Sequence, residues 1–137
     1  MYVLAIVEDP VLNKENTNAW EQDSLEIFID ENNNKTGFYE NDDAQYRINY
    51  VNTPSFGTGG SAANFKTTTK IIESGYIVEA AISWRFISPS GGEVVGFDVQ
   101  VNDAGATGSR VGITTWNDPT GNNYQSTVNF GNIILEK

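Results

Sequence analysis

The chain has 137 residues, of which 39% are hydrophobic, so it is long enough to form one domain with a buried core. Its 18 acidic residues against 8 basic ones give a formal net charge of -10, which argues against binding to nucleic acid or to an anionic membrane. The sequence contains neither cysteine nor histidine, which excludes disulfides, the common zinc and haem sites, and Ser-His-Asp or Cys-His catalysis.

The first predicted element is a strand over residues 2–7, a near-continuous apolar run that we expect to be buried and to end at the turn formed by residues 8–10. This run is too short for a secretory signal peptide and lacks a basic flank, so no signal peptide is predicted. No apolar run reaches the roughly 20 residues that a membrane span needs. A sequence that begins within a strand is expected to be truncated at its N-terminus.

Two predicted strands carry the residues on which the functional hypothesis depends. Trp20 stands in a polar loop, and the strand that follows it is apolar on one face and carries Glu26 on the other. In residues 44–51 the same alternation places Gln45 and Arg47 on a solvent-exposed face. If the two strands pair, these side chains share a polar surface beneath Trp20, and such a surface suits a ligand with polar edges and an apolar face, such as a sugar.

The remainder of the chain predicts further short strands and no helix. In residues 94–102, Val95, Phe97, Val99 and Val101 are expected to point inward, and Asp98, Gln100 and Asn102 outward. Residues 30–43 form an acidic loop, and residues 52–64 and 117–129 form loops rich in Gly, Asn and Ser. The other predicted strands cover residues 65–72, 76–85, 110–116 and 130–135. Short strands at this spacing indicate an antiparallel β-sandwich formed by one domain over residues 1–137.

Several segments closely resemble the family 9 carbohydrate-binding modules of bacterial xylanases. They read YVLAIVEDPVLN, NAWEQDSLEIFIDENNNKTGFYENDDAQYRINYVN, SFGTGGSAANFKT, GYIVEAAISW, GFDVQVNDA, RVGITTWNDPTGNNY and FGNIILEK, and together they cover nearly the whole chain. The resemblance implies a jelly-roll-like β-sandwich with structural calcium. It also implies a non-catalytic module, secreted as part of a larger bacterial glycoside hydrolase such as a xylanase.

The resemblance further implies which ligands the module binds. They are the reducing ends of cellulose and xylan, and soluble sugars such as glucose, cellobiose and xylo-oligosaccharides. Family modules carry additional strands ahead of the segment that matches here. Without those strands we expect an exposed apolar surface and an unpaired sheet edge, which the chain is expected to cover by forming a homodimer or by rearranging the edge.

The resemblance assigns the sugar contacts to residues of this chain. Two aromatic rings clamp the terminal sugar, and they correspond to Trp20 and to Tyr124, which stands where the family has Trp. The rim contacts correspond to Glu26, Gln45 and Arg47, whereas the family's Asn in the last loop is replaced by Gly121, so Asn122 or Asn123 is expected to substitute for it. The candidate calcium ligands are Asp9, Asp30, Asp42 and Asp43.

The residues alone leave other interpretations open. Trp20 is as consistent with a core plug as with a sugar platform, and Glu26 with Arg47 could be a simple cross-strand ion pair. Trp84 and Trp116 are assigned chiefly to structure, although Trp116 could border the site.

Two other functions are therefore considered. The first is a small glycoside hydrolase with a pair of carboxylates drawn from Glu26, Glu79 and Asp98. A cation beside Glu26 argues against it, because it favours the carboxylate over the acid that catalysis needs. The second is an interaction sandwich without a sugar site.

Overall fold

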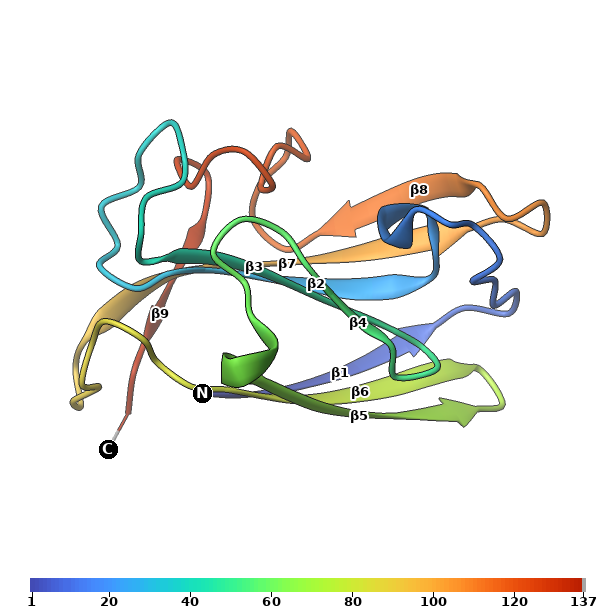
Figure 1. The fold of residues 1–137 in the computed structure, drawn as a ribbon, viewed down its shortest axis with the longest axis horizontal. Helices are drawn as coiled ribbons and strands as arrows, with labels where there is room; N and C mark the ends of the chain where they lie inside the picture. Colours follow the sequence, from blue (N-terminus) through green and yellow to red (C-terminus); the bar gives the residue numbers. More distant parts are fainter. Residues whose placement is uncertain (137) are drawn as a thin grey trace.

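The computed structural model describes residues 1–136, which fold as two antiparallel β-sheets stacked face to face (Figure 1). The smaller sheet has the strand order β1-β6-β5, and the larger has the order β4-β3-β2-β7-β8, with β9 beside β7. The strands are β1 (Tyr2–Glu8), β2 (Ser24–Asp30), β3 (Asp43–Asn49), β4 (Pro54–Phe56), β5 (Phe65–Ile72), β6 (Gly75–Ile82), β7 (Val94–Ala104), β8 (Arg110–Thr115) and β9 (Gly131–Ile134). The predicted all-β sandwich is confirmed.

The core lies between the two sheets and is built by the apolar phase of each strand. Leu25, Ile27 and Ile29 of β2 point inward, as the alternation predicted, and meet the buried side chains of β6. Tyr46 of β3 stacks on Phe65 of β5 at 4.9 Å between ring centroids, which joins the two sheets directly. Each fully buried side chain of this size contributes roughly 1.5–3 kcal/mol to folding.

The second face of the larger sheet is buried as well, which corrects the prediction of a solvent-exposed polar face. Every residue of β2 and of β3 is buried, including the charged ones. On β7, Asp98, Gln100 and Asn102 are buried although they were expected to point into solvent. The reason is that η1 (Ala19–Glu21) and the loops at 31–42 and 116–130 lie over this side of the sheet, away from the smaller sheet (Figure 1).

The opposite surface of the sandwich, the outer face of the smaller sheet, corrects the prediction that the first strand is buried. Within residues 1–136, β1 is an edge strand that pairs only with β6, and its side chains alternate between the core and solvent. Its outward residues Tyr2, Leu4 and Ile6 are 90%, 64% and 63% exposed. An apolar run was therefore a poor guide to burial at a sheet edge, where only one face has a neighbour.

Two short elements lie where the sequence predicted only a loop. β4 and the 3₁₀ turn η2 (Ala62–Asn64) fall within residues 52–64, and β4 extends the larger sheet beside β3. Both are too short to show a hydrophobic period. Among the described residues, no helix is long and apolar enough to cross a membrane.

Candidate functional site

A pocket of 460 Å³ opens on the loop-covered face of the larger sheet. Its floor comes from β2, β3, β7 and β8, and its walls come from η1 and the loop at 116–130. Its lining residues are Trp20, Glu26, Gln45, Arg47, Phe56, Gly57, Gln100, Arg110, Ile113, Gly121 and Tyr124. The size and the mixture of aromatic and polar groups are those of a small-molecule site.

Glu26 lies in the pocket floor and is only 2% exposed. The two strands pair, as the shared polar surface required, and their register sets Glu26 opposite Arg47, whose Nε donates to Glu26 Oε1 over 2.7 Å. Gln45 Nε2 donates to Glu26 Oε2 over 2.5 Å. Because the buried carboxylate is held by these charge-assisted and amide hydrogen bonds, its position is fixed before any ligand arrives.

Asn102 of β7 fixes the donor and acceptor pattern of this floor. Its Nδ2 donates to Glu26 Oε1 over 2.7 Å and to Ser24 Oγ over 3.0 Å, and its Oδ1 accepts from Gln100 Nε2 and Arg110 Nη1. Arg110 can only donate and the Glu26 carboxylate can only accept, so the amide has one possible orientation. All of its hydrogen-bonding capacity is used, which makes Asn102 a support for the pocket rather than a ligand contact.

Trp20 is held at the rim of the pocket by its neighbours in sequence. Glu21 Oε2 accepts the backbone N–H of Arg110 over 2.9 Å, which ties η1 to β8. Gln22 Oε1 accepts from Asn49 Nδ2 over 2.8 Å, which ties the same turn to β3. The indole is 47% exposed, so Trp20 is a rim residue and not a core plug.

Tyr124 belongs to a loop that is built on two buried aspartates. Asp98 accepts the backbone N–H groups of residues 117 and 118, and Asp118 accepts those of residues 120 and 122. Burial opposes ionisation of Asp118, but hydrogen bonds from residues 120, 129 and 122 outweigh it and hold the pKa of this carboxyl below its usual value. The loop therefore holds Tyr124, which is 52% exposed, on the wall of the pocket.

The two asparagines expected to replace the family's Asn have different places. Asn123 is fully buried, its Nδ2 donates to Asp98 Oδ2 over 3.0 Å, and its carbonyl accepts from Tyr39 Oη over 2.5 Å. Asn123 therefore holds the loop at 116–130 in place from its buried side and does not line the pocket. Asn122 is exposed and does not line the pocket either, whereas Gly121 does, with its backbone in the left-handed region at φ 69°.

Sequence reasoning missed part of the pocket lining. Gln100 was identified only as an outward residue of its strand, and Phe56, Gly57, Arg110 and Ile113 were not singled out. Gln100 and Ile113 could have been found from strand alternation once the neighbours of β7 were known. Gly57 follows β4, which the sequence did not reveal. Trp84 packs against the core and Trp116 lies outside the pocket, against Phe97.

Three of the four candidate calcium ligands come together at the far end of β2 and β3. The carboxylates of Asp30, Asp42 and Asp43 offer oxygens within 4.8 Å of one another. Oδ1 of Asp30 and Oδ1 of Asp43 are buried without any hydrogen-bond partner. Burial, together with the charges of its acidic neighbours, raises the pKa of Asp43 to about 6. Buried, unpartnered carboxylate oxygens of this kind fit a hard cation such as calcium.

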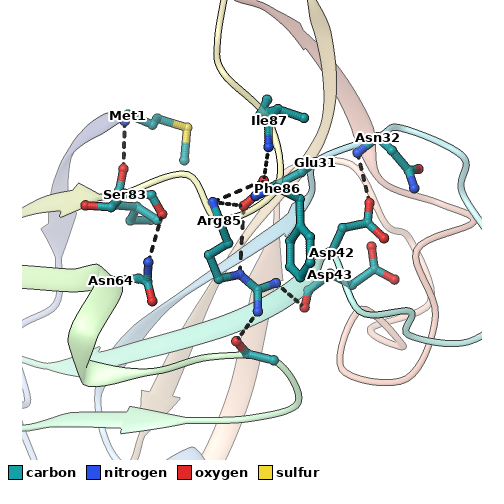
Figure 2. Close-up of polar contacts among 12 residues, drawn as sticks. Met1, Glu31, Asn32, Asp42, Asp43, Asn64, Ser83, Arg85, Phe86 and Ile87 are labelled. Atoms are coloured by element: carbon teal, nitrogen blue, oxygen red, sulfur yellow. Dashed lines mark hydrogen bonds and ion pairs between the residues drawn. The ribbon is translucent and has the colours of Figure 1, made fainter.

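The backbone around this acidic group is fixed by Arg85 and Glu31 (Figure 2). Arg85 Nη2 donates to the carbonyl of Asp43 over 2.9 Å, and the Glu31 carboxylate accepts the backbone N–H groups of Arg85, Phe86 and Ile87. Asn32 N donates to Asp42 Oδ2 over 3.0 Å, and Figure 2 shows the side chains of Asp42 and Asp43 beside one another. The positions of Asp42 and Asp43 are therefore fixed by contacts with Arg85, which follows β6, and with Asn32 of the loop at 31–42.

Asp9, the fourth candidate, lies in a different group, with Asp23 and Asp103. Asp23 accepts the backbone N–H of Ala104 over 2.6 Å and of Asn13 over 2.5 Å. Burial raises the pKa of the Asp23 carboxyl to about 6, with Asp9 adding to the effect. The sequence did not single out Asp23 or Asp103, because they are close to Asp9 only in the folded chain.

The carboxylates do not form a hydrolytic pair in the pocket. Glu26 is the one acidic residue among those that line it in the described part of the chain. Asp98 is buried beneath the loop at 116–130, where it accepts backbone N–H groups, and Glu79 is exposed on the smaller sheet. The two-carboxylate mechanism needs both groups at one glycosidic bond, and the three candidates are in three different places.

A β-sandwich with a polar floor between two exposed aromatic rings has the form of a sugar-binding module without catalytic groups. Residues 1–137 match the family model "Carbohydrate family 9 binding domain-like", so the chain belongs to family 9 of the carbohydrate-binding modules. It is accordingly a non-catalytic carbohydrate-binding module.

Similar chains occur within much longer enzymes. The chain is 66% identical over its whole length to part of endo-1,4-beta-xylanase A of Thermotoga neapolitana, and 53% identical over 98% of its length to part of exoglucanase XynX of Acetivibrio thermocellus. It spans only 13% and 12% of these two relatives.

Solved structures show the same fold. A family 9 module from Caldicellulosiruptor kristjanssonii in complex with cellotriose superposes with a TM-score of 0.94 at 43% identity, and the match covers 98% of this chain and 68% of that one. A structure of a module from the same organism in complex with glucose gives the same TM-score and identity and covers 70% of that chain.

Proposed function

We propose that the pocket holds one terminal sugar ring between Trp20 and Tyr124. The observation that carries this proposal is that both exposed rings line one pocket whose floor is the fixed Glu26, Gln45 and Arg47 group. The faces of a pyranose are C–H surfaces that pack on aromatic rings, and its edge is a set of hydroxyls that need donors and acceptors. Within residues 1–136, Arg47 Nη2 has no hydrogen-bond partner and is free to donate to such a hydroxyl.

The proposed ligands are glucose, cellobiose, cello-oligosaccharides and xylo-oligosaccharides, bound at their reducing ends. The support is the pair of similar modules in complex with cellotriose and with glucose. A floor closed by buried polar groups also favours a chain end over an interior unit, because a missing hydroxyl leaves those groups unpaired. The module would then bring an attached glycoside hydrolase to cellulose or xylan outside the cell, as part of a longer bacterial enzyme.

Calorimetric titration with glucose and cellobiose tests the proposal. We expect saturable binding of both sugars and no release of shorter products when cello- and xylo-oligosaccharides are incubated with the chain. Turnover that disappears in Glu26→Gln would favour a hydrolase. The absence of heat from every sugar would favour an interaction sandwich.

We also propose that calcium stabilises the fold at the group of Asp30, Asp42 and Asp43. The support is the two buried carboxylate oxygens without partners, which a divalent cation would satisfy. Melting with calcium and with excess chelator tests this, because binding to the folded state alone adds about 2.7 kcal/mol of stability at a calcium concentration 100 times Kd. Identical melting in the two conditions would contradict a structural calcium.

A homodimer through β1 is proposed as well. The edge of β1 that faces away from β6 has no neighbouring strand among the described residues, and Tyr2, Leu4 and Ile6 expose apolar surface beside it. An unpaired edge with apolar side chains is a template for pairing with a second chain. Light scattering over a range of concentrations tests the proposal, and a monomer at the highest concentration would contradict it.

A further inference from the structure

Gly57, the residue after β4, lies against the side chain of Gln45. A Cβ atom placed on Gly57 would lie 1.9 Å from Gln45 Oε1, 2.6 Å from its Cδ and 3.0 Å from its Cβ. These distances are far below the 3.4 Å at which ordinary van der Waals contact begins. The backbone of Gly57 is not in the left-handed region, so the position needs glycine for space and not for conformation.

The chain at Gly57 is tied to the backbone of Gln45. Gly57 N donates to the carbonyl of Gln45 over 3.1 Å, and Gln45 N donates to the carbonyl of Thr58 over 3.0 Å. Two backbone hydrogen bonds therefore hold the segment on both sides of Gln45. An added methyl group would displace the flexible amide, and its 3.0 Å approach to Gln45 Cβ, which rotation of the side chain does not change, would require a further shift of a few tenths of an ångström.

We propose that Gly57 is a positioning residue that sets the Gln45 amide, and through it the floor of the sugar pocket. The bare backbone at Gly57 lets the amide lie beside it with Oε1 toward Gly57 and Nε2 toward Glu26 Oε2, 2.5 Å away. This orientation fixes which end of the amide donates and which accepts at the pocket. The inference rests on the proposed function, because it concerns the same pocket.

A substitution at Gly57 is therefore expected to change sugar affinity more than it changes the stability of the fold. Gln45 has a long side chain that can rotate away from a methyl group at little cost to folding. The rotated amide no longer donates to Glu26 and presents a different edge to the ligand. A substitution at Gly57 is thus expected to act on affinity chiefly through the Gln45 amide.

The test is a double-mutant cycle read by calorimetric titration with cellobiose. Gly57→Ala and Gln45→Ala are each expected to weaken binding about tenfold, and the double variant is expected to bind no more weakly than Gln45→Ala. The matched control is Gly37→Ala, because a Cβ at Gly37 would meet no atom within 4 Å and its φ is not positive, so affinity should be unchanged.

Two results would overturn the inference while leaving the sugar site intact. One is wild-type affinity in Gly57→Ala. The other is a full additional loss in the double variant, which would mean that the methyl group obstructs the ligand or strains the backbone. If Gly57→Ala alone does not fold, a folded double variant that binds like Gln45→Ala supports the inference, and an unfolded one overturns it. A wild-type chain that binds no sugar would overturn the proposed function as well.

Discussion

The two outer faces of the sandwich reverse the usual relation between polarity and burial. On the larger sheet, Glu26, Arg47 and Asn102 are buried beneath loops. On the smaller sheet, Tyr2 and Leu4 of β1 face solvent. Burying charge and exposing large apolar side chains both cost stability unless something compensates.

The two faces differ in how the cost of their side chains is compensated. Around Glu26 the polar face is compensated within the chain, since Glu26, Arg47 and Asn102 are hydrogen-bonded to one another or to their neighbours. The apolar face has no such compensation among the described residues. The pocket proposed for the sugar is therefore lined by groups that this chain holds in place, whereas the apolar surface of β1 is the one proposed to pair with a second chain.

The largest effect is expected from removing one wall of the pocket. Trp20→Ala should weaken cellobiose binding by about 2–4 kcal/mol, or roughly 30- to 1000-fold, because a stacking ring is lost from the rim. Calorimetric titration measures it. Trp116→Ala is the matched control, since Trp116 is 56% exposed, close to the 47% of Trp20, but lies outside the pocket. Similar losses in both variants would break the assignment of the site.

A smaller loss is expected from removing the support under the floor. Asn102→Ala leaves Glu26 and Arg110 without a shared partner, which should lower the free energy of unfolding by about 1–3 kcal/mol, and affinity should fall by about 1 kcal/mol because Glu26 is no longer held in place before the ligand binds. The same titration measures it, with the exposed Asn132→Ala of β9 as the control. Wild-type affinity in Asn102→Ala would show that the polar face is not preorganised as described.

Self-association through the apolar face of β1 should be weakened by a charge placed on it. Leu4→Lys places a cation on the outward side of β1 and is expected to weaken self-association about tenfold, because each copy brings a like charge to the shared edge. Light scattering or sedimentation measures it. Lys70→Leu, on the opposite edge strand β5, is the control and should leave association unchanged. Equal changes in both would show that the contact is not at β1.

The smallest effect is a gain. Tyr124→Trp enlarges the second ring of the pocket and is expected to strengthen cellobiose binding by about 0.5–1 kcal/mol, which is roughly two- to fivefold. Titration of the variant beside the wild type measures it. Weaker binding in Tyr124→Trp would mean that the pocket is shaped for the smaller ring.

The fold was predictable because most strands show a clear period of two, and the phases of β2 and β3 placed Glu26 and Arg47 on the polar faces of their strands, although only the structure gives the register that sets them opposite one another. The burial of the polar face was not predictable, because it depends on a loop that Asp98 and Asp118 hold over the sheet. The resemblance to the family supplied Trp20 and Tyr124, which periodicity alone left ambiguous. Asn102 and Gly57 were missed because their importance lies in contacts between distant strands.

The central claim is that a terminal sugar with a free reducing end fills the space between Trp20 and Tyr124. The most direct measurement is calorimetric titration of the wild-type chain with cellobiose and with its reduced alditol, cellobiitol. We expect saturable binding of cellobiose and an affinity at least about tenfold lower for cellobiitol, because reduction opens the ring at the reducing end, which the two aromatic side chains would hold. Equal affinity for the two compounds would contradict the claim.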